Sequence, residues 1–140
     1  MNILLGLLCV LICTVIQCAF IAAVRIGIHK RALPSRIADQ FFKLTALLSA
    51  VTIWLFIGML VQVAVWAIVF VAVGEIDGLS TAAYFSMVNF TSLGYGDITL
   101  SADRAILGPM EAANGILMLG LSTSALFSIL RDVATADQSR

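Results

Sequence analysis

Three long apolar runs dominate the pattern of hydrophobic and polar positions along the chain. They cover residues 1–24, 44–73 and 105–130. Each is long enough to cross a hydrocarbon core of ~30 Å as a helix that rises ~1.5 Å per residue. A partly apolar segment, residues 81–90, is too short to span. The pattern predicts an all-α membrane protein with three transmembrane helices and one re-entrant segment.

Composition agrees with this prediction. Of the 140 residues, 61% are hydrophobic and 11% are charged, whereas about 25% of the residues in a soluble domain are charged. A water-soluble fold cannot cover so much apolar surface, so we expect the chain to be embedded in a membrane. The net charge is zero, which gives no basic bias toward nucleic acid.

The charges around the first run predict its topology. No Lys or Arg precedes the run, so it does not read as a signal peptide, and we expect a retained helix. Residues 25–43 form a basic loop, which the positive-inside rule places in the cytoplasm, with the N-terminus outside and the tail, residues 131–140, inside. An interfacial helix is expected to start near Ser35 of this loop. Four of its basic residues are candidates to bind anionic lipid head groups, beside a purely topological role: Arg25, Lys30, Arg31 and Arg36.

A short motif, TSLGYGD at residues 91–97, follows the re-entrant segment. Gly94 and Gly96 exclude a stable helix there and can adopt backbone angles that other residues avoid. Non-helical backbone at membrane depth is tolerated only inside protein or along a water-filled path. Alternating such residues lets successive carbonyls face one axis, where they can replace the water around a cation. The C-terminal dipole end of the preceding short helix favours a cation at the same place.

The motif resembles the selectivity filter of tetrameric potassium channels, whose loops read TVGYG. The resemblance covers about residues 44–130, in the order outer helix 44–73, pore helix 81–90, filter 91–97 and inner helix 105–130. It implies a homotetramer that conducts K⁺ passively, with no cofactor and no enzymatic chemistry. A cell (inner) membrane location is expected.

The resemblance also implies roles for residues of the motif. The ion-coordinating residues are Ser92, Leu93, Gly94, Tyr95 and Gly96, with K⁺ bound at the first four. Supporting residues are Thr91, Asp97, Tyr84 and Phe85; the last two stand where some members carry a Trp pair that surrounds the filter. Ser92 replaces the usual Thr, and Leu93 stands where Val or Ile is usual. These two departures leave the degree of selectivity open.

In the inner helix, Gly115 and Gly120 match a glycine hinge and a second small residue, although helix packing through small residues explains them equally well. By alignment from Gly120, we expect three residues to line the cavity: Leu119, Thr123 and Phe127. Phe127 is also a candidate for a hydrophobic constriction, formed by one Phe127 from each copy, that gates the pore by dewetting.

Other residues are singled out by their positions alone. Glu111 is an ionisable residue inside an apolar run, and we expect it to support the filter from behind; a place at the outer interface is the alternative, because Pro109 can delay the helix. Trp66 is expected in an aromatic belt near the outer end of its helix. Cys9 and Cys13 share a helical face that is directed toward lipid or toward the core.

Three other functions compete with that of a potassium channel. A weakly selective monovalent cation channel is suggested by Ser92 and Leu93. A non-conducting membrane subunit would be favoured by a damaged filter, and this motif is intact. An enzyme needs a nucleophile with a base or a set of metal ligands, which His29 and the isolated cysteines do not supply. The first run lacks an arginine ladder, so it does not read as a voltage sensor.

Overall fold

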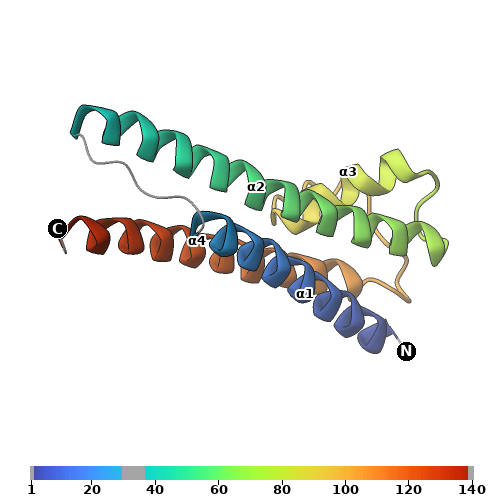
Figure 1. Ribbon diagram of the computed structural model, residues 1–140. Coiled ribbons are helices and arrows are strands. Elements are labelled where there is room, and N and C mark those ends of the chain that lie inside the picture. Colours follow the sequence, from blue (N-terminus) through green and yellow to red (C-terminus); the bar gives the residue numbers. More distant parts are fainter. Residues whose placement is uncertain (1, 30–36, 139–140) are drawn as a thin grey trace.

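The computed structural model describes residues 2–29 and 37–138, and within these ranges the chain is helical without strands. Its helices are α1 (Asn2–His29), α2 (Ile37–Ala72), α3 (Leu79–Phe90) and α4 (Leu107–Gln138). The long helices α1, α2 and α4 lie side by side, and the short α3 packs at one end of this bundle, mainly against α2 (Figure 1). The predicted all-α membrane fold is confirmed.

Three of these helices are long and apolar enough to cross a membrane, over Asn2–Gly27, Leu44–Ala72 and Leu107–Asp132. They coincide with the three apolar runs. The structure begins α2 at Ile37, so residues 37–43 continue directly into the spanning helix. Part of the expected basic loop lies outside the described residues: Lys30, Arg31, Arg36 and the expected helix start at Ser35.

Local sequence explains where the last two helices begin. Gly78 has a φ of 84° and precedes the first residue of α3, a backbone conformation that glycine adopts without strain. Pro109 lies in the first turn of α4, where its missing N–H would have had no partner within the helix. Pro109 therefore does not break the third spanning helix.

Aromatic packing joins α3 to α2. Trp66 and Phe70 of α2 are fully buried and stack with ring centroids 5.8 Å apart, and Phe85 of α3 meets Phe70 edge-on at 5.1 Å. The expected place of Trp66 in an interfacial belt is wrong, because its ring is enclosed between helices. Cys9 and Cys13 of α1 are buried in the same cluster, so their shared face is directed toward the core.

A second contact fixes α1 against the middle of α2. The Phe20 ring lies over Gly58, where an added Cβ would come within 2.9 Å of it. The Trp54 ring packs beside Phe20 at 5.0 Å and its indole N–H donates to the Phe20 carbonyl at 3.1 Å. The helix that precedes the predicted pore region is therefore an integral part of the bundle.

Candidate functional site

The filter segment, residues 91–97, follows the C-terminus of α3. Its first backbone N–H groups donate back to carbonyls in the last turn of that helix. The Ser92 N–H donates to the Asn89 carbonyl at 2.8 Å. The Leu93 and Gly94 N–H groups both reach the Val88 carbonyl, at 2.9 and 3.4 Å. Within the described part of the chain, none of the carbonyls of residues 92–96 accepts a hydrogen bond. The N–H groups of residues 92–94 therefore have partners, whereas the carbonyls of residues 92–96 form a row of free acceptors.

Backbone angles alternate along the same segment. Ser92, Gly94 and Gly96 have φ values of 61°, 57° and 74°, whereas Leu93 and Tyr95 between them are not in the positive-φ region. Sequence reasoning anticipated the two glycines and missed Ser92, although its spacing of two from Gly94 was the available signal. Positive φ is uncommon for a residue with a side chain, and Ser92 adopts it at the position that continues the alternation of Gly94 and Gly96.

A side-chain hydrogen bond joins α3 to the far end of the filter segment. The Tyr84 hydroxyl donates to the Asp97 carboxylate at 2.8 Å, and this bond raises the pKa of Tyr84. At the near end, the Thr91 hydroxyl donates to the Met87 carbonyl at 2.7 Å. The structure thus joins both ends of the segment to α3, Asp97 through Tyr84 and Thr91 through Met87. The Tyr95 ring is 65% exposed, which leaves it open to a neighbouring molecule.

The second expected ring, Phe85, lies in a different environment from Tyr84. It is buried and contacts Phe70 of α2 edge-on. Phe85 therefore anchors α3 to α2. It contributes to the site by fixing the position of α3.

Glu111 of α4 lies behind α3 and is fully buried. The Ser86 hydroxyl of α3 donates to its carboxyl group, and the same hydroxyl lies 2.9 Å from the Val63 carbonyl of α2. This place behind α3 is the one expected for a supporting role, which stays a prediction. Asn114, one turn further along α4, is also buried, and neither polar atom of its side chain has a hydrogen-bond partner among the described residues. Sequence reasoning missed Asn114; its spacing of three from Glu111 was the signal.

Gly115 and Gly120 of α4 have different surroundings. A Cβ added at Gly115 would overlap the carbonyl oxygen of Phe90, the last residue of α3. At Gly120 nothing lies within 4 Å of an added Cβ. Gly115 is therefore required for close packing of α4 against α3, and only Gly120 stands in open space.

Three residues expected to line a cavity share an exposed face of α4. The side chains of Leu119 and Phe127 are 42% and 67% exposed, and Thr123 is exposed between them. The Thr123 hydroxyl also donates to the Leu119 carbonyl at 2.9 Å. Ser122 is turned to the opposite, buried side. The exposed face is available to neighbouring copies or to an aqueous path.

Outside the filter segment, a polar cluster joins the loops on either side of it. The Glu75 carboxylate accepts from the Ser101 backbone N–H at 2.8 Å, from its hydroxyl at 2.7 Å and from Arg104 at 3.0 Å. Arg104 also donates to the Val73 carbonyl. The hydrogen bonds from Ser101, followed by those from Arg104, hold the pKa of Glu75 below its ordinary value.

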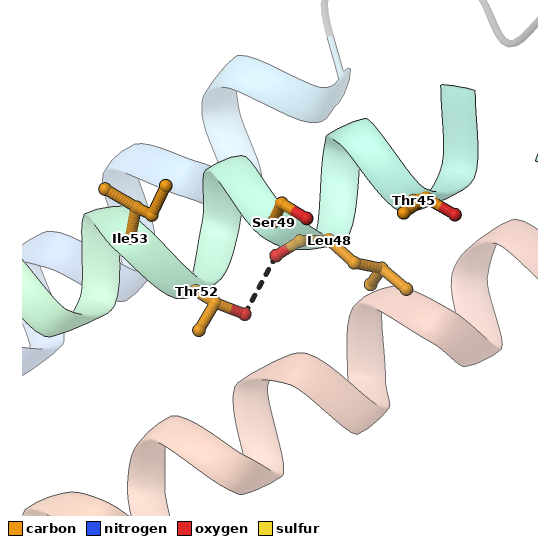
Figure 2. Close-up of a pocket in the computed structure, with 5 residues that line it drawn as sticks. All are labelled: Thr45, Leu48, Ser49, Thr52 and Ile53. Carbon is orange, nitrogen blue, oxygen red and sulfur yellow. Dashed lines mark hydrogen bonds between the residues drawn. The ribbon is translucent and has the colours of Figure 1, made fainter. Parts of the chain in front are cut away.

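A groove on α2 lies apart from these residues. It has a volume of about 450 Å³ and is lined by Thr45, Leu48, Ser49, Thr52 and Ile53 (Figure 2). The Thr52 hydroxyl donates to the Leu48 carbonyl at 2.9 Å. None of the residues singled out by the sequence lines this groove.

Comparison with known proteins identifies one family. A family model described as ion channel matches residues 49–132. The match includes most of α2, all of α3, the filter segment and much of α4, and it leaves α1 outside. Neither the curated proteins nor the solved structures gave a match.

The contact at Gly115 predicts that glycine-to-alanine substitutions at Gly115 and at Gly120 have different effects on stability. We expect Gly115→Ala to lower the unfolding free energy by about 1–3 kcal/mol, because the new methyl group must push the Phe90 carbonyl away. Gly120→Ala adds the same methyl group in open space and should be neutral or slightly stabilising. Unfolding of both purified variants in detergent measures this, and equal stabilities would contradict the packing role.

The burial of Glu111 predicts that its removal destabilises the protein. Glu111→Ala deprives Ser86 of a partner and leaves a void beside Asn114, so we expect a loss of roughly 2 kcal/mol or more and a weaker assembly or smaller current. Asp103→Ala removes an exposed acid and is the matched control, with an effect within about 0.5 kcal/mol. Wild-type behaviour of Glu111→Ala in unfolding and conduction would remove its supporting role.

The lowered pKa of Glu75 predicts a pH dependence of stability. Its stabilising effect is present above the ordinary pKa of a glutamate, roughly 4.3, and is lost as the pH falls through the lowered value. The difference in Tm between wild type and Glu75→Gln should therefore be constant from about pH 5 to 7 and shrink below roughly pH 4. Asp77→Asn, in the same loop, controls for the change of charge. A Tm difference that is the same at every pH would exclude the ionised cluster.

Proposed function

The chain belongs to the ion-channel family, and from that premise we propose that it forms a potassium-selective channel from four copies. Each copy contributes one filter segment, and K⁺ passes between them without any covalent chemistry. The backbone carbonyls of Ser92, Leu93, Gly94 and Tyr95, with the Ser92 hydroxyl, replace the water around the ion. K⁺ is the permeant ion, and the proposal includes no other cofactor.

One observation carries this proposal, namely the arrangement of the filter backbone. Its N–H groups at residues 92–94 are used by the last turn of α3, and the carbonyls of residues 92–96 have no partner in the described chain. φ is positive at every second residue, Ser92, Gly94 and Gly96, and we propose that this alternation turns successive carbonyls to one side. A row of unpaired carbonyl oxygens is the ligand set that potassium filters use in place of water.

Assembly of four copies is part of the same proposal. A single filter segment offers ligands on one side of an ion only, so the site is incomplete without its neighbours. The exposed face of α4 and the exposed Tyr95 ring are the surfaces that neighbours would cover. Leu119, Thr123 and Phe127 then line the cavity, with Phe127 as the gate.

Placement in the membrane completes the proposal. The channel resides in the cell membrane with its N-terminus outside and its C-terminus in the cytoplasm. Arg25, at the inner end of α1, is exposed, and with Lys30, Arg31 and Arg36 it offers positive charge to anionic lipid head groups.

The proposal predicts a reversal potential. With purified protein in a planar bilayer, K⁺ on one side and Na⁺ on the other, we expect the current to reverse close to the K⁺ equilibrium potential. A reversal potential near zero would contradict potassium selectivity and indicate a weakly selective cation channel. Ser92 and Leu93 would then be the first residues to test as the cause of the low selectivity. No current from protein shown to be tetrameric would contradict conduction itself.

Two glycines with similar backbone angles provide a matched control. Gly94 and Gly74 have φ values of 57° and 73°, and an added Cβ meets nothing within 4 Å at either position. An alanine is strained in both places. We expect Gly94→Ala to abolish selective current, and Gly74→Ala to keep the wild-type reversal potential. Equal behaviour of the two variants would show that strain in general, rather than the filter segment, controls conduction.

A further inference from the structure

A chain of buried side chains links α1 to the inner half of α4. The Gln17 side-chain amide of α1 donates to the Ser122 hydroxyl of α4 at 2.8 Å. Nearer the C-terminal end of the same two helices, Arg25 donates to Ser128. We infer that α1 is a polar latch that holds the inner half of α4 and slows its movement during gating. Gln17 is the positioning residue, and the inference rests on the proposed function.

Gln17 stands at the centre of the buried chain. The Gln62 amide of α2 donates to the Gln17 carbonyl oxygen at 2.7 Å, and Ser122 donates onward to the Met118 carbonyl at 2.9 Å. Gln17 and Gln62 are fully buried, and Ser122 is 8% exposed. A polar group buried among apolar helices is costly when it loses its partner. Separation of α4 from α1 would therefore leave Gln17 without an acceptor.

The latch holds α4 on one side of the turn that contains Gly120, where nothing lies near an added Cβ. On one side, Gly115 fixes α4 against the Phe90 carbonyl of α3. On the other side, Ser122 and Ser128 fix it against α1. Gly120 lies between these contacts, exposed and with nothing near it. A bend at Gly120 must either break the Gln17–Ser122 hydrogen bond or carry α1 with it.

Further contacts of α1 show which of these two events is easier. The Asn2 side chain donates to the Asp103 carbonyl at the opposite end of the bundle. Phe20 packs into the space above Gly58 of α2, and Trp54 holds it there. Since α1 is held at its first turn and in its middle, it cannot follow α4 freely. Bending of α4 therefore breaks the latch, which resists it.

Single-channel recording tests this inference. Single-channel records give a mean open and a mean closed dwell time. We expect Gln17→Leu and Ser122→Ala each to shorten one of these two times by about fivefold. This is the factor that corresponds to the loss of a hydrogen bond of ~1 kcal/mol. The other dwell time, the conductance and the reversal potential should not change, because the filter segment is not involved. The double variant should equal either single variant. Ser122→Thr keeps the hydroxyl and should restore wild-type dwell times.

Controls separate this inference from the proposed function. Cys18→Leu changes an exposed residue next to Gln17 and should leave both dwell times unchanged. Unchanged dwell times in Gln17→Leu, or additive effects in the double variant, would overturn the latch. If the wild type carries no current, the proposed function fails. Thermal unfolding of the same double-mutant cycle then tests the Gln17–Ser122 contact, and additive losses in that cycle would overturn it as well.

Discussion

The rest of the structure depends on one constraint, the hydrogen-bonding needs of the non-helical filter segment, residues 91–97, which lies between two spanning helices. Lipid offers no hydrogen bonds to bare backbone, so every donor of the filter segment needs a partner in the protein. The last turn of α3 supplies partners for the N–H groups of residues 92–94 through Val88 and Asn89. What remains is a set of carbonyl oxygens that no group of the described chain uses, and the proposed function assigns a cation to them.

The surrounding helices can be understood as supports for α3. Phe85 packs it on the aromatic cluster of α2, and Ser86 joins it to Glu111 of α4. Gly115 lets the end of α3 approach α4 more closely than any side chain would allow. These contacts lie on the buried sides of α3, whereas the Tyr84–Asp97 hydrogen bond fixes the far end of the filter segment. The short helix is therefore held from behind and along its length before any neighbouring copy is added.

Sequence reasoning predicted what depends on local pattern and missed what depends on pairing between distant segments. The three spanning helices follow from apolar runs, and the filter segment follows from its two glycines. Trp66 was misplaced because hydropathy does not distinguish a ring that faces lipid from one that faces another helix. The Gln17–Ser122 contact joins residues 105 positions apart, and nothing local to either residue indicates it. The close contact of Gly115 depends on the path of α3, which the sequence of α4 does not contain.

The most direct test is a high-resolution map of the assembled protein in K⁺-containing buffer. The account predicts four copies around one axis, with ion density in a row between the carbonyls of residues 92–95 and with α1 on the side of α4 away from that axis. A different symmetry, or filter segments that face away from a common axis, would contradict the central claim that free carbonyls of four chains bind the permeant ion.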